Sequence, residues 1–257
     1  ILTVVPRQNQ AFWTLCALWA AGLGGRDAGL PLRGALERRR YDWNWMARAL
    51  HTALAGPNRP LQPSTPFFAL AGELTPSFLL ALFIAPNMAG FGLNGVALNP
   101  EEDNAQFWWI SRKPAASPSR QSPKTISQEA VRNYLRQRGE PASYQSLYAA
   151  TLLGLAQAGL LPTQINELPV DYFGRTQATL AEVLQNRSFV QRYPGKSQAE
   201  EGGMWWLTGS PEVEAPLADR VEREVVNQLL TQAEVDQTAL EAHLNRLFPG
   251  LNTPSRT

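Results

Sequence analysis

Short apolar runs alternate with helix-period segments over residues 1–111, and this alternation restricts the possible folds more than any other feature. The predicted strands are the short β-branched or aromatic runs at 1–5, 67–71, 92–98 and 105–111. The predicted helices are the longer stretches at 9–23, at 36–54 before Gly56-Pro57, and from Thr75-Pro76 to about Ala89-Gly90. A polar, turn-rich separator at 99–104 predicts an antiparallel hairpin between the last two strands. We therefore expect an α/β domain whose sheet has an antiparallel end.

A segment rich in proline and serine, residues 112–124, predicts a linker after this first domain. Beyond it lie helical patterns at 126–138, 143–159 and 177–185, then strand patterns at 188–193 and 203–208 around the polar loop 194–202. Three helices followed by a two-stranded hairpin are typical of a winged-helix domain, which we place at 125–210. The extension 211–257 is predicted to be amphipathic helix in two pieces over 215–248, with a frayed tail from Pro249.

Composition and charge exclude several classes of protein. A formal net charge of +1 excludes a protein that binds polyanions strongly through its overall charge. It does not exclude a local basic face. The sequence contains one cysteine, Cys16, and two histidines, His51 and His243. These are too few for a Cys/His zinc site, so we expect no metal. No signal-peptide pattern is present, and the apolar stretch 11–23 is too short to span a bilayer. The sequence therefore predicts a cytoplasmic protein without membrane contact, and a chain that opens inside a strand pattern predicts a piece of something longer.

Three stretches of the first domain carry a resemblance to a known family. They are Leu2-Thr-Val-Val-Pro-Arg-Gln-Asn-Gln-Ala-Phe-Trp13, Arg39-Arg-Tyr-Asp-Trp43, and residues 67–91. They resemble bacterial DNA-methyltransferase-like proteins that carry a helical C-terminal extension, closely over roughly the first 110 residues and loosely beyond. The resemblance implies the second half of a class I methyltransferase fold, a partial Rossmann-like sheet from its fourth strand through the closing antiparallel hairpin.

The resemblance places a catalytic motif directly after the first predicted strand. In amino-methylating DNA methyltransferases this strand ends in Asp/Asn/Ser-Pro-Pro-aromatic, which grips the target amine and stacks on a flipped base. Here the strand ends in Val4-Val5-Pro6-Arg7, so only the proline matches and an arginine replaces the aromatic. The candidate catalytic residues are therefore Pro6, Arg7, Asn9 and Gln10.

The resemblance also implies S-adenosylmethionine as a cofactor, but no residue of this chain is assigned to it. Gly22-Leu-Gly-Gly25 follows a helix pattern and not a strand, which predicts a helix C-cap and turn rather than a cofactor loop. Either a missing N-terminal half carries the cofactor site, or the chain is a degenerate relative without catalysis. A hydrolase is not predicted, because neither His51 nor His243 has a carboxylate at a spacing that indicates a catalytic pair.

Basic residues of the winged-helix-like segment predict contacts with duplex DNA. The candidates lie on the predicted helices and near the wing: Arg132, Arg136, Arg138, Arg175, Arg192 and Lys196. A solvated basic face on a packing domain is the alternative. The pairs Trp108-Trp109 and Trp205-Trp206 lie on predicted strands, where one ring faces the core and its neighbour faces outward. A second hypothesis is therefore a non-enzymatic scaffold that docks another protein through its winged helix and exposed tryptophans.

Overall fold

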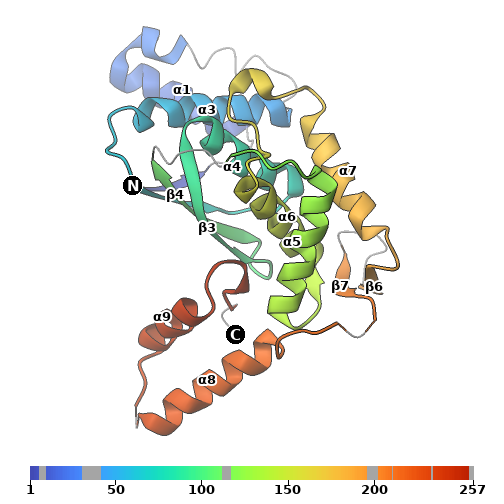
Figure 1. The fold of residues 1–257 in the computed structure, drawn as a ribbon. Helices are drawn as coiled ribbons and strands as arrows, with labels where there is room; N and C mark the ends of the chain where they lie inside the picture. Colours follow the sequence, from blue (N-terminus) through green and yellow to red (C-terminus); the bar gives the residue numbers. More distant parts are fainter. Residues whose placement is uncertain are drawn as a thin grey trace.

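The alternation of strands and helices produces a mixed α/β structure with a larger and a smaller sheet (Figure 1). The computed structural model describes residues 1–5, 10–30, 42–111, 117–195, 202–209, 211–232 and 234–254, with the side chains of all but residues 10–16 and 57. In this part of the chain no helix is both long and apolar enough to cross a membrane.

The larger sheet is four-stranded and mixed, in the order β1-β2-β4-β3. It consists of β1 (Leu2–Val5), β2 (Pro66–Ala71), β3 (Phe91–Asn99) and β4 (Asn104–Ser111). β1 and β2 run parallel, and β4 runs antiparallel to both of its neighbours. The expected strands and the expected antiparallel hairpin are thus confirmed, and the second strand of the hairpin lies in the interior of the sheet.

Among the described residues, the long helices that accompany this sheet are α1 (Gln10–Gly24), α3 (Trp43–Asn58) and α4 (Pro76–Met88). α4 starts at Pro76 as predicted, although the Thr75 side chain makes no capping hydrogen bond. Ten of the residues of α4 are buried, as expected for a helix that is apolar all round. α4 packs on α3 and β3, and also on α6 (Tyr144–Gln157) and α7 (Tyr172–Leu184), which belong to the second unit, residues 117–209.

The bounds predicted for the second helix are wrong at both ends. α3 begins at Trp43 because the Asp42 carboxylate caps it, accepting a hydrogen bond from the Trp45 amide at 2.6 Å. Its C-terminal end passes through Gly56 and Pro57 to Asn58, since a proline in a last turn removes only one helical hydrogen bond. The arginine run predicted to open this helix falls within residues 31–41, outside the described part of the chain.

The second unit holds three helices and a three-stranded antiparallel sheet of order β5-β7-β6. Its elements are α5 (Pro123–Arg138), β5 (Ala142–Ser143), α6 (Tyr144–Gln157), α7 (Tyr172–Leu184), β6 (Val190–Pro194) and β7 (Gly203–Leu207). The sequence missed the two-residue β5 and placed the start of α7 too late. It also extended the linker too far, because the Ser122 hydroxyl caps α5, which begins at Pro123.

The two units share one hydrophobic core, although their sheets are separate. A single cluster of buried side chains runs from the larger sheet through α4 to α5, α6 and β7. Polar contacts cross the same seam: Asn87 donates to the Pro162 carbonyl at 2.8 Å, and Gln177 donates to the Ser77 hydroxyl at 2.9 Å. α4 therefore serves as a central helix for both units.

The C-terminal extension forms helices α8 (Leu217–Thr231) and α9 (Gln237–Leu247), which confirms the prediction of two pieces. Together they project from the rest of the chain as an arm (orange to red in Figure 1). The prediction of a frayed tail from Pro249 is wrong over residues 249–254, which are ordered against the core. Gly250, at φ +70°, turns the chain into a 3₁₀ turn against β3, and Leu251 packs on the core. The Tyr134 hydroxyl donates to the Leu251 carbonyl at 3.4 Å.

Candidate functional site

The carboxyl ends of the parallel strands β1 and β2 form the edge at which α/β sheets bind ligands. The structure does not test the catalytic candidates predicted for this edge. Pro6, Arg7 and Asn9 lie outside the described residues, and Gln10 opens α1 with a side chain that is not described. A carboxylate is present at the edge, but it has a structural role: Asp103, in the β3–β4 turn, accepts a hydrogen bond from the Leu74 amide at 2.9 Å.

A cavity of about 630 Å³ lies outside the same edge, between the sheet and the α8–α9 arm. Apolar side chains from the sheet and the arm line it, among them Leu70, Leu240 and Leu244. Glu102 and Glu241 contribute carboxylates to its lining. Amide side chains also line it, among them Asn99, Gln106 and Asn245, so the cavity suits a ligand that carries both apolar and hydrogen-bonding groups.

The predicted DNA-contacting residues of α5 differ in what they touch. The Arg132 guanidinium lies over the Phe189 ring, 5.1 Å from its centroid. Arg138 forms an ion pair with Glu140 at 2.8 Å, and both side chains are largely covered. Arg136 is exposed in the last turn and has no ion pair among the described residues. Arg132 and Arg136 are four residues apart, so they share one face of α5.

The remaining predicted basic residues are partly neutralised. Arg175 pairs with Asp171 at 3.0 Å along the exposed side of α7. Arg192 on β6 donates to the Gly202 carbonyl and so fastens the base of the β6–β7 loop. Lys196 lies outside the described residues. Arg132 and Arg136 therefore share one face of α5, whereas Arg138 and Arg175 are ion-paired.

The larger sheet has an exposed apolar face that the sequence analysis did not predict. The strand register aligns Leu2, Phe68 and Trp108 in one row, and Val4, Leu70 and Gln106 in the next. Leu2 is 82% exposed and Val4 67% exposed, and neither row carries a charge. The opposite face holds the core, with alternating burial along β2.

Parallel strands are ordinarily covered on both faces, and large exposed apolar patches mark interaction sites. A signal for this surface was present in the sequence. Phe67-Phe-Ala-Leu-Ala71 is apolar at every position, which indicates a strand whose two faces are both meant to be covered.

The predicted division of the tryptophan pairs between core and surface is confirmed for the first pair. Trp109 is buried, whereas Trp108 is partly exposed and stacks on Phe68 with ring centroids 5.6 Å apart. In the second pair Trp205 is buried and Trp206 is half-buried. Of these two pairs, the more exposed tryptophan therefore lies on the larger sheet.

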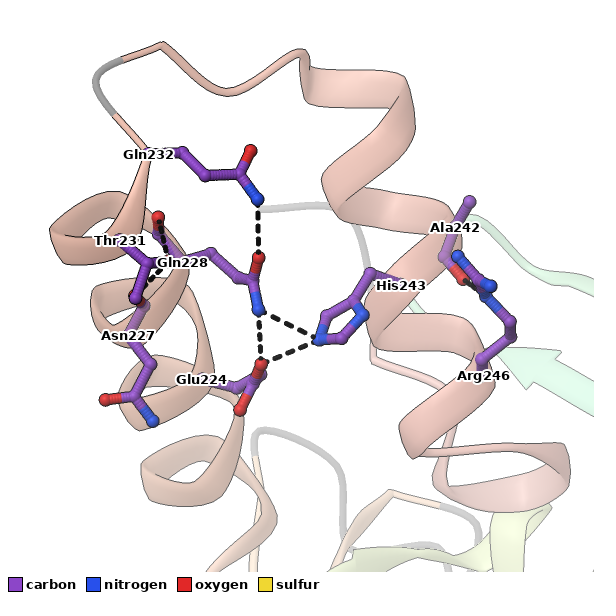
Figure 2. A network of polar contacts seen from close by, with 8 residues as sticks. All are labelled: Glu224, Asn227, Gln228, Thr231, Gln232, Ala242, His243 and Arg246. Atoms are coloured by element: carbon purple, nitrogen blue, oxygen red, sulfur yellow. Dashed lines mark hydrogen bonds and ion pairs between the residues drawn. The ribbon is translucent and has the colours of Figure 1, made fainter.

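Figure 2 shows a histidine beside a carboxylate, an arrangement that the sequence analysis did not find. His243 Nε2 on α9 lies 2.6 Å from Glu224 Oε1 on α8, and Gln228 Nε2 donates to the same oxygen at 2.9 Å. The hydrogen bonds from Gln228 and from His243 lower the pKa of the Glu224 carboxyl below its usual range. Because the pairing joins two helices across a turn, sequence spacing gives no sign of it.

The contacts of this cluster are structural. Glu224, Gln228 and Gln232 follow one side of α8 at four-residue intervals, and Gln232 Nε2 donates to Gln228 Oε1 at 3.3 Å. Through His243 the row ties α8 to α9, which share few other contacts. In the described part of the chain, no three His, Cys, Asp or Glu side chains gather closely enough to hold a metal ion.

The resemblance to DNA methyltransferases stays a prediction from the residues quoted above. Comparisons of the chain with protein-family models, with curated proteins and with solved structures found no match.

Proposed function

We propose that the chain is a DNA-binding, methyltransferase-like protein that is catalytically degenerate or depends on a missing N-terminal half for methyl transfer. The observation that carries the proposal is the strand order β1-β2-β4-β3, a parallel pair followed by an antiparallel hairpin. It supports the resemblance to the second half of a class I methyltransferase sheet. The apolar helix α4, which connects β2 to the hairpin, adds the crossover that a parallel-type sheet requires.

The glycine-rich segment supports a role without a cofactor site of its own. α1 ends at Gly24, and Gly25 follows at φ +83° in the left-handed region. A glycine in this conformation terminates a helix and does not form the strand-to-helix turn on which S-adenosylmethionine would lie. On this proposal the cofactor site lies on a missing N-terminal half or has been lost.

DNA binding is assigned to the second unit, whose order of helices and strands supports the winged-helix interpretation. Phosphate contacts are assigned to Arg132 and Arg136 on α5. The exposed charges of α7 largely cancel, because Arg175 pairs with Asp171 and Glu182 with Lys124. We therefore expect binding that depends on phosphates and discriminates little between base sequences.

Fluorescence anisotropy of labelled duplex DNA tests this proposal. Phosphate contacts release counterions, so the logarithm of the binding constant should fall linearly with the logarithm of salt concentration. Two duplexes of unrelated sequence should bind with similar affinity. Addition of S-adenosylmethionine should leave the titration unchanged. The absence of a shift at low salt would refute the proposal.

A second candidate function is a protein-interaction scaffold, and the uncovered apolar sheet face favours it. Leu2, Val4, Phe68 and Trp108 offer an uncharged surface that suits a polypeptide and repels no partner by charge. The dye ANS, which reports exposed apolar surface, should bind the folded chain and bind less when Phe68 is replaced by serine. Unchanged ANS binding by Phe68→Ser would count against this candidate.

A further inference from the structure

Another cavity lies at the seam between the two units, at the opposite end of the larger sheet from the α8–α9 arm. Its volume is about 580 Å³, within the usual range for a small-molecule site. The end of α4, the start of β3, the end of β4, the last turns of α6 and the loop after α6 contribute its lining. β4 shows the separation, because Gln106 near its start lines the arm cavity and Trp109 near its end lines this one.

The buried part of this cavity is aromatic and uncharged. Phe83, Phe91 and Trp109 line it, and each is at most 2% exposed. Trp109 stacks on Phe107 with ring centroids 5.1 Å apart and an interplanar angle of 9°, which fixes the position of its ring. None of the described residues that line the cavity carries a charge. An ion would lose its hydration there without gaining a charged partner, so the cavity favours a neutral ligand with an aromatic ring.

Two side chains of the lining have hydrogen-bonding capacity that the chain does not use. The indole N–H of Trp109 is buried and has no hydrogen-bond partner among the described residues. A buried donor without a partner is costly, so a ligand that supplies an acceptor relieves that cost. Asn87 Nδ2 donates to the Pro162 carbonyl at 2.8 Å, which holds the amide in place, and no described residue donates to Asn87 Oδ1. The pair suits a ligand with both a carbonyl oxygen and an N–H group.

A β-bulge in β3 shapes the more exposed part of the cavity. Leu93 pairs with Trp109 and Gly95 with Trp108, so Asn94 has no partner residue on β4. Neighbouring residues of a regular strand point to opposite faces, yet Leu93 and Asn94 both line the cavity. Bulges occur often beside functional sites, where they redirect a side chain. The bulge thus adds the exposed amide of Asn94 to the lining.

We propose that this cavity binds a neutral, flat aromatic molecule that carries an amide or a similar carbonyl group. The ring packs among Phe83, Phe91 and Trp109. The carbonyl oxygen accepts a hydrogen bond from the Trp109 indole, and an N–H group of the ligand donates to Asn87 Oδ1. The site goes beyond DNA binding and does not depend on it, because the lining includes none of the arginines assigned to phosphate contacts.

Isothermal titration calorimetry of the full chain with matched small probes tests the chemistry of the ligand. Benzamide carries the ring and the amide, toluene carries the ring alone, and benzoate and benzamidine carry a negative and a positive charge. Benzamide should bind about fivefold more tightly than toluene, the gain expected from one hydrogen bond. The two charged probes should bind more weakly than benzamide, because each loses its hydration. Failure of benzamide to bind up to its solubility limit, equal binding of toluene, or equal binding of a charged probe would overturn the proposal.

A substitution that fills the cavity tests its position. Ala156 is partly buried on α6 and lines the cavity, so Ala156→Leu should abolish benzamide binding while leaving Trp109 in place. Ala53→Leu makes the same change at an exposed position of α3 outside the lining, and its affinity for benzamide should equal that of the wild type. Undiminished binding by Ala156→Leu would place the benzamide elsewhere and overturn the proposal.

Nuclear magnetic resonance of the isotopically labelled wild-type chain tests the hydrogen bond from Trp109. Its indole N–H signal, assigned through contacts with the rings of Phe67 and Phe107, should move when benzamide is added. Trp205 is the internal control, because its buried indole nitrogen also has no partner among the described residues, but it lies on β7 outside the lining. Trp109→Phe should reduce the affinity for benzamide to that for toluene. If that variant does not fold, the wild-type signals decide: benzamide that binds without moving the Trp109 signal, or that moves the Trp205 signal equally, would overturn the proposal.

Discussion

Tyr148, in the middle of α6, gives a prediction whose size follows from its surroundings. The residue is fully buried, and its hydroxyl has no hydrogen-bond partner among the described residues. A buried polar group without a partner costs about 1–3 kcal/mol. Tyr148→Phe removes the hydroxyl and keeps the ring, which stacks on Tyr144 with centroids 6.2 Å apart. We therefore expect the free energy of unfolding to rise by about 1 kcal/mol at pH 8.

The same substitution should change how stability depends on pH. Burial, reinforced by the neighbouring Tyr144 and Tyr172, raises the pKa of the Tyr148 hydroxyl in the folded chain. In the unfolded chain this pKa is about 10, so above that pH only the unfolded state loses the proton. The free energy of unfolding is therefore not reduced by the ionisation of Tyr148 below about pH 10. Above pH 10 this ionisation lowers it by about 1.4 kcal/mol per pH unit.

Tyr148→Phe lacks this loss, so its advantage over the wild type should grow to about 2.4 kcal/mol at pH 11. Burial also raises the pKa of Tyr172, to about 12, but that contribution is common to both proteins and cancels in the difference.

Urea denaturation followed by circular dichroism at pH 8 and pH 11 measures both effects. Tyr193→Phe serves as the control, because Tyr193 is exposed on β6 and its hydroxyl accepts a hydrogen bond from the Gln191 amide at the surface, at 2.8 Å. A loss of stability on changing Tyr148 to Phe at pH 8 would show that the hydroxyl is hydrogen-bonded in the folded chain. An advantage that does not grow with pH would contradict the burial argument.

Three further substitutions test other parts of the structure. Gly139→Ala should lower the free energy of unfolding, measured by urea denaturation, by more than about 1 kcal/mol. Gly139 has φ +72°, and its added Cβ would overlap carbonyl groups of the segment before α8. Gly56→Ala is the control and should not lower this free energy, because an added Cβ at Gly56 on α3 meets open space. The pKa of Glu224 is lowered in the folded chain, so its hydrogen bonds stabilise the arm above the unfolded pKa of about 4.3 and this stabilisation is lost as the pH falls below it. Acidification should therefore reduce the helical circular dichroism of the wild type more than that of Glu224→Gln. Arg136→Ala should reduce the slope of DNA affinity against salt by about 1, whereas Arg246→Ala on α9 should leave the slope unchanged.

Elements marked by local signals were predictable from the sequence. α4 starts where Thr75-Pro76 indicated, and the polar separator at 99–104 joins antiparallel strands as expected. The start of α3 was mistaken although its signal was also local. An amphipathic pattern that included the arginine run outweighed Asp42, whose carboxylate caps the helix.

Contacts between distant segments could not be read from the sequence. His243 meets Glu224 only because α8 and α9 fold back on each other, and Leu251 reaches the core only after the turn at Gly250. The continuity of the core through α4 is of the same kind. The exposed sheet face was partly predictable, because the apolar run Phe67-Phe-Ala-Leu-Ala71 already indicated a strand covered on both sides. The sequence of one strand does not identify the segment that covers it.

The central claim is that the second unit binds duplex DNA through phosphate contacts and that this chain alone takes up no cofactor. Anisotropy titrations of one labelled duplex at about 50 mM and about 200 mM salt, with and without S-adenosylmethionine, test it most directly. The account predicts binding that weakens steeply with salt, is reduced in Arg132→Ala and Arg136→Ala, and does not respond to S-adenosylmethionine. No binding at the lower salt concentration, or binding that S-adenosylmethionine strengthens, would contradict it.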